Sequence, residues 1–62
     1  METVKDKALM IKEQTEAMLE SFDSFKGLKS LKAIKKCMEE INRISTEGIE
    51  QVDRLESKWK GR

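Results

Sequence analysis

Five lysines lie between residues 26 and 36 with no acid among them, and they form the densest cluster of charge in the chain. Three of them recur at helical spacing and would share one face of a helix. Clustered ammonium groups are typical of a site for an anion, such as a nucleic-acid backbone, a nucleotide phosphate or an acidic protein. The candidate anion-binding residues are Lys26, Lys29, Lys32, Lys35 and Lys36.

The same lysines also have a purely structural interpretation, because an acidic stretch precedes them in the chain. In an antiparallel hairpin the acidic and basic stretches would lie side by side and could form ion pairs across the turn. A similar match recurs at the other end, where the lysines of residues 5–12 would lie near the acids of residues 47–56. The sequence leaves both interpretations open. The acids before the turn are Glu13, Glu16, Glu20 and Asp23.

The residue types needed for catalysis or for metal binding are scarce in this chain. It contains no histidine, no tyrosine and one cysteine, Cys37. A single cysteine forms no intramolecular disulfide, and without histidine one copy of the chain cannot assemble a zinc site of four protein ligands. We interpret Cys37 as a half-buried structural residue rather than a reactive thiol. We therefore expect no enzymatic activity, no cofactor and no metal.

The apolar residues that must position these groups recur in alternating steps of three and four, which is the spacing of coiled-coil helices. The first such stretch begins at Val4, after a capping box formed by Thr3 and Asp6, and runs to about Phe25. Gly27 interrupts the register and can adopt the left-handed conformation that ends a helix. We predict an all-α fold, an antiparallel helical hairpin with its turn near Gly27.

The second stretch covers residues 28–59 without a proline and predicts a long second helix. Because the arms are unequal, the last part of this helix would extend beyond the hairpin and leave its apolar residues uncovered. Either the chain bends at residues 45–48 to form a third helix, or these residues pack against another protomer. We predict the continuous helix and an interface formed by Val52, Leu55 and Trp59.

A chain of 62 residues forms one domain, residues 1–62, and buries too little surface for a large core. Because disulfides and metals are excluded as supports, we expect the hairpin to assemble into a helical bundle or coiled-coil oligomer. The plan resembles small dimeric bundles in which two helical hairpins pair into four helices, although no motif is shared. The predicted seam is Leu28, Leu31, Ile34, Met38, Ile41, Val52 and Leu55.

Net charge and hydropathy limit the expected location of the protein and the classes of partner that it can bind. The net charge is +1, so no overall field attracts the chain to nucleic acid or to an anionic membrane. Residues 1–7 lack the apolar core of a secretory signal, and no stretch has the length of apolar residues that crosses a bilayer. We expect a cytoplasmic protein with no membrane partner.

Two functional hypotheses remain. The first is a small non-enzymatic regulator, inhibitor or adaptor, of the size common among bacterial and phage regulatory proteins, that forms homo-oligomers and binds a partner protein. The second is an oligomeric anion-binding module whose pooled lysines hold RNA, DNA or a small phosphorylated nucleotide.

Overall fold

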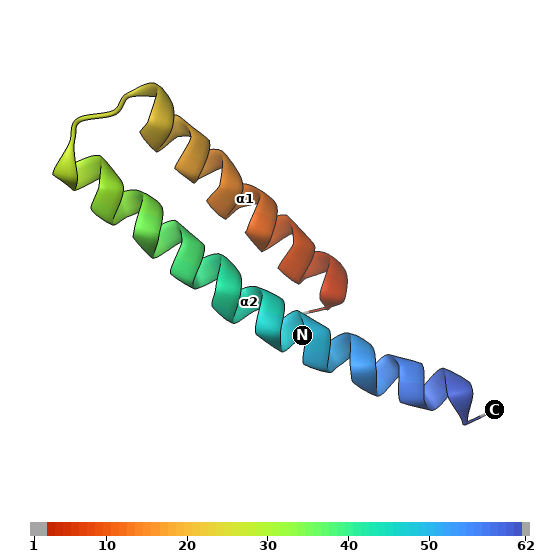
Figure 1. Cartoon of the computed structure of the whole chain (residues 1–62). Helices are drawn as coiled ribbons and strands as arrows, with labels where there is room; N and C mark the ends of the chain where they lie inside the picture. The colour runs from red at the N-terminus through yellow and green to blue at the C-terminus, as the bar shows by residue number, and fades with distance from the viewer. Residues whose placement is uncertain (1–2, 62) are drawn as a thin grey trace.

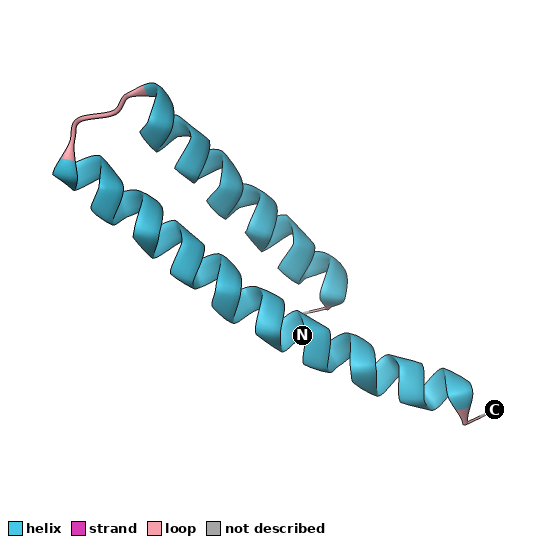
Figure 2. Ribbon diagram, in the orientation of Figure 1, coloured by secondary structure: helices cyan, strands magenta, loops and turns pink. Residues whose placement is uncertain are grey.

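The computed structural model describes residues 3–61, in which two α-helices lie antiparallel (Figure 1). Helix α1 covers Val4–Asp23, helix α2 covers Leu28–Lys60, and residues 24–27 join them. The described part of the chain contains no strand (Figure 2). The helices have 20 and 33 residues, and the molecule measures 53 × 17 × 15 Å. The predicted all-α hairpin with a long second helix is confirmed, while residues 1–2 and 62 of the predicted domain lie outside the description.

The start of α1 is fixed by the capping box that the sequence predicts. The Asp6 backbone N–H donates to Thr3 Oγ1 at 3.1 Å, and the Thr3 backbone N–H donates to Asp6 Oδ2 at 3.0 Å. Each bond satisfies a backbone donor that the first turn of a helix leaves without a partner. Such a cap stabilises a helix by about 1 kcal/mol, so α1 begins at Val4 as predicted.

Helix α1 ends at Asp23, two residues before the predicted end at Phe25. Ser24 follows with φ −110° and ψ 48°, outside the helical region, and its hydroxyl donates to the Glu20 carbonyl at 2.9 Å. The backbone N–H of Ser24 donates to the same carbonyl at 3.0 Å. Serine is favoured in turns, and Ser24 opens the segment that joins the two helices.

Gly27 makes the turn and precedes the first residue of α2. Its φ of 77° lies in the region that side chains with a Cβ atom rarely adopt, which confirms the predicted turn at this residue. Ser30, in the first turn of α2, is buried and its Oγ accepts from the Lys26 backbone N–H at 2.7 Å. The turn is therefore held by a glycine conformation and one buried hydroxyl.

Buried and half-buried residues recur in steps of three and four along one side of each helix and form the seam between them. Ile34 and Ile44 are the buried hydrophobic residues of the described chain, with 7% and 1% of their surface exposed. The hydrophobic core is therefore thin. On α1 the seam residues are Lys7, Ile11, Gln14, Met18 and Ser21, and on α2 they are Ser30, Ile34, Cys37, Ile41, Ile44 and Gly48.

Of the predicted seam, Ile34 and Ile41 lie between α1 and α2, and the other members are exposed on the single chain. Their packing against a second copy stays a prediction. Helix α1 packs against one edge of the apolar stripe of α2, where the small residues Ser30, Cys37 and Gly48 permit a close approach. The rest of the stripe faces solvent. The exposed members of the predicted seam are Leu28, Leu31, Met38, Val52 and Leu55.

Helix α2 runs through Gly48 without a bend, as predicted. Gly48 faces α1, where a Cβ atom would lie 3.6 Å from Cδ of Lys7. This distance is an ordinary van der Waals contact, so the methylene groups of Lys7 pack against Gly48 and leave room for a methyl group. The continuous helix carries residues 52–60, which we call the overhang, past the start of α1 (Figure 1).

Candidate functional site: an apolar face across both helices

The principal candidate site is an apolar surface on one side of the hairpin. It is built from two lines of residues that recur every seven positions, so each line follows one side of its helix. All of these residues except Ser45 are exposed. We call this surface the apolar face. Its members are Ala8, Thr15 and Phe22 on α1, and Leu31, Met38, Ser45, Val52 and Trp59 on α2.

A groove of about 430 Å³ joins the two lines at the open end of the hairpin. Val4 and Ala8 line it from α1, and Ser45, Ile49 and Val52 line it from α2. Because one groove contains residues from both lines, the two lines lie on the same side of the molecule. An open groove with apolar walls is a surface on which another apolar side chain can be buried.

The overhang holds the three interface residues that the sequence predicts. Val52 lies at the end of the groove, and Leu55 and Trp59 follow it on the part of α2 that continues past the start of α1. Trp59 has 72% of its surface exposed. The structure thus places Val52, Leu55 and Trp59 together on one exposed end of the molecule.

A second uncovered apolar group lies at the turn, at the opposite end of the molecule, and was not predicted as an interface. Phe22 and Phe25 are half exposed, and Leu28 has 67% of its surface exposed. The sequence contains the signal for this group, since both phenylalanines lie on the apolar stripe of the first helix. Without knowledge of how α1 is rotated against α2, they are interpreted as core.

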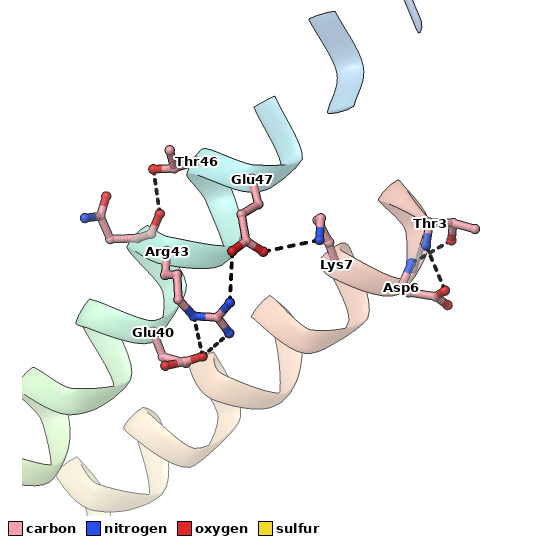
Figure 3. A network of polar contacts seen from close by, with 8 residues as sticks. Thr3, Asp6, Lys7, Glu40, Arg43, Thr46 and Glu47 are labelled. Carbon is pink, nitrogen blue, oxygen red and sulfur yellow. Dashed lines mark hydrogen bonds and ion pairs between the residues drawn. The ribbon is translucent and has the colours of Figure 1, made fainter. Parts of the chain in front are cut away.

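A polar network at the open end connects the two helices (Figure 3). Lys7 is buried, with 8% of its surface exposed, and its Nζ donates to Glu47 Oε1 at 3.4 Å. Arg43 Nη1 donates to the other oxygen of Glu47 at 3.1 Å, and Arg43 Nε donates to Glu40 Oε1 at 2.9 Å. Of the predicted pairing of residues 5–12 with residues 47–56, the structure shows the pair Lys7–Glu47, which links α1 to α2.

The pKa of the Arg43 guanidinium is raised by its hydrogen bond with Glu40, by the charge of that carboxylate and then by Glu47. Both carboxylates therefore favour the charged form that arginine already has at any ordinary pH. Arg43 is exposed, so its ion pairs with Glu40 and Glu47 contribute little to stability.

The five candidate lysines do not gather into one site. Lys26 lies in the turn, and the others lie on α2, where all of them are exposed. By helical position, Lys29, Lys32 and Lys36 share the side of α2 that is opposite the apolar face, whereas Lys35 lies at the edge of that face.

The predicted pairing of these lysines with the acids of α1 is wrong. Across residues 3–61, none of the five ammonium groups lies within 4.0 Å of a carboxylate. The reason is the rotation of the helices, because the acidic side chains lie on the side of α1 that faces away from α2. All four acids are exposed, namely Glu13, Glu16, Glu20 and Asp23.

The remaining candidate groups give no site. Cys37 is half-buried in the seam, as predicted. Within residues 3–61, no three acidic, histidine or cysteine side chains are placed to share a metal ion. In that same part of the chain, neither helix has a run of apolar residues that would let it cross a membrane.

Comparisons of the chain with protein-family models, with curated proteins and with solved structures give no match.

Proposed function

We propose that this protein is a non-enzymatic helical adaptor or regulator that acts by binding protein surfaces, first of all another copy of itself, through the apolar face. The observation that carries the proposal is the exposure of that face along the whole hairpin. Monomeric proteins that stay free in water rarely expose contiguous apolar patches of more than a few hundred Å².

The area available is sufficient for a stable interface. Nine large apolar side chains are exposed on the apolar face, in the groove, at the turn and on the overhang. At roughly 100 Å² each, about half of what a buried aromatic covers, they offer about 900 Å², close to the ~800 Å² per partner of a standard interface. The nine are Phe22, Phe25, Leu28, Leu31, Met38, Ile49, Val52, Leu55 and Trp59.

The thin core supports the same conclusion. A 62-residue chain in which Ile34 and Ile44 are the buried hydrophobic residues of the described part gains little free energy from its own seam. Association would bury the remaining apolar side chains and would stabilise the folded hairpin by mass action. We therefore propose that folding and association are coupled in this protein.

A matched pair of substitutions on adjacent residues of α2 tests this proposal. Leu31→Glu places a carboxylate on the apolar face, and Lys32→Glu places one on the opposite side of the same helix turn. Because a buried unpaired carboxylate is costly, we expect Leu31→Glu to reduce the mass in light scattering to the 7.2 kDa of one chain. Lys32→Glu should keep the oligomer mass. Equal masses for both variants would contradict the proposal, provided that circular dichroism shows both to be helical.

A second candidate function, an oligomeric anion-binding module, is favoured by one specific observation. The lysines of residues 26–36 have no ion pairs with carboxylates of the described chain, so their ammonium groups face solvent. In an oligomer, Lys29, Lys32 and Lys36 from several copies would add up to a stronger local field than one chain provides. Such a field suits RNA, DNA or a phosphorylated nucleotide.

The lysine triple variant K29Q/K32Q/K36Q tests this second candidate, with K5Q/K12Q/K58Q as the control that removes the same charge elsewhere. If the anion-binding function is correct, a labelled oligonucleotide binds the wild type and the control but not the first variant. For duplex DNA, the logarithm of the affinity should fall with the logarithm of salt concentration by about 0.9 for each phosphate neutralised. No binding by the wild type, or equal loss in both variants, would contradict it.

A further inference from the structure

We propose that the second copy covers the apolar face in one defined arrangement, antiparallel to the first and related to it by a two-fold axis at the level of Ile44. In this dimer the overhang of each copy covers the turn of the other. The inference depends on the proposed function, because it names the occupant and the orientation of the interface proposed there.

The shape of the hairpin favours an antiparallel dimer. At one end, the overhang has no α1 beside it, so the side of α2 that carries Leu55 and Trp59 is left uncovered. At the opposite end, Phe22 and Phe25 are half exposed. An antiparallel dimer brings these two ends together and lets the Trp59 ring fill the space next to the turn of the other copy. A parallel dimer would set the two overhangs beside each other and would leave the apolar residues at both turns uncovered.

The length of α2 determines where along the helix the two-fold axis lies. Antiparallel helices of equal length overlap completely when the axis passes through their midpoint, and the midpoint of Leu28–Lys60 is residue 44, since (28 + 60)/2 = 44. With this register all 33 residues of α2 lie beside α2 of the second copy. Any other register leaves part of the apolar line on α2 without a partner.

The charges along α2 give the same axis independently. Residues 26–36 carry five lysines and no acid, whereas residues 47–56 carry four acids and one arginine. Lys35 and Asp53 are 18 residues apart, which is about five helical turns, so they occupy the same side of α2.

Asp53 lines the groove, which places this side at the edge of the apolar face. The midpoint between Lys35 and Asp53 is again residue 44, since (35 + 53)/2 = 44. A two-fold axis there sets Lys35 of each copy opposite Asp53 of the other. A parallel dimer would place lysines against lysines and acids against acids.

Charge reversal tests the arrangement. Lys35→Glu and Asp53→Lys each create two like-charge contacts in the proposed dimer, because the two-fold axis repeats every contact. We expect each single variant to raise the dimer dissociation constant about tenfold, and the double variant Lys35→Glu/Asp53→Lys to return it to within about threefold of wild type. Lys29→Glu, the same charge change on the opposite side of α2, should leave the constant unchanged.

A disulfide experiment tests the orientation separately, in a Cys37→Ser background. A cysteine in place of Ser45 lies next to the axis, so oxidation should link two copies through it. A cysteine in place of Val52 lies about 24 Å along the helix from its mate in the second copy and should not link. A parallel dimer would link at both positions.

The outcomes distinguish the inference from the proposed function. A wild-type chain that stays monomeric overturns both. A wild-type dimer whose dissociation constant does not respond to charge reversal, or that links through position 52, overturns only the antiparallel arrangement. Rescue by the double variant together with linkage only at position 45 supports the inference.

Discussion

At the scale of single residues, two glycines serve opposite purposes in this hairpin. Gly27 adopts a φ of 77° and allows the chain to reverse, and no atom lies within 4 Å of where its Cβ would be. Gly48 has ordinary helical geometry and lies in the seam against Lys7, with space for a methyl group at van der Waals distance. The backbone conformation at residue 27 requires glycine, whereas the helical conformation at residue 48 does not.

Alanine at each position should therefore shift stability in opposite directions. Gly27→Ala forces a Cβ into a strained region of φ and ψ and should lower the free energy of unfolding by about 1–3 kcal/mol. Gly48→Ala removes the entropic cost of glycine in a helix interior and should raise the free energy of unfolding by up to about 1 kcal/mol. Urea unfolding at one fixed chain concentration measures both. A stabilising effect of Gly27→Ala would contradict the turn, and a large loss with Gly48→Ala would contradict the open contact with Lys7.

Contacts between residues close in the sequence could be predicted, whereas contacts that depend on the path of the chain could not. The capping box of Thr3 and Asp6 spans three residues, so it was visible in the sequence and is present in the structure. The end of α1 two residues before Phe25 and the hydrogen bond of the buried Ser30 hydroxyl with Lys26 both depend on the path of the turn. Neither follows from periodicity.

At the scale of the elements, the number, order and approximate bounds of the helices could be predicted, because apolar spacing and one glycine determine them. The rotation of α1 about its own axis relative to α2 could not be predicted. The apolar stripe of α2 is wider than one seam requires, so the sequence does not say which edge receives α1. This rotation exposes Leu31 and Met38, buries Ile44, and separates the lysines from the acids of α1.

The same rotation defines the candidate site. If the apolar stripe of α2 packed against α1 alone, α1 would cover all of it. In the structure α1 covers one edge of the stripe only. Helices in four-helix bundles contact two neighbours each, so both of their apolar edges are used. The exposed edge of α2 thus has the position expected for a contact with a second helix of the same kind.

At the scale of the whole molecule, the uneven hairpin is the feature that connects fold and function. An arm of 33 residues beside an arm of 20 leaves an uncovered end on every copy, and the turn leaves another at the opposite end. Antiparallel association covers both kinds of end with one interface. We therefore propose that the folded state of this chain is a two-fold dimer.

Sedimentation equilibrium of the wild-type chain, over a range of micromolar concentrations, tests this claim most directly. Because one chain has a mass of 7.2 kDa, the account predicts a species of twice 7.2 kDa that dissociates on dilution and loses helical signal as it does so. A fully helical chain that sediments as a single 7.2 kDa species at every concentration would contradict the account.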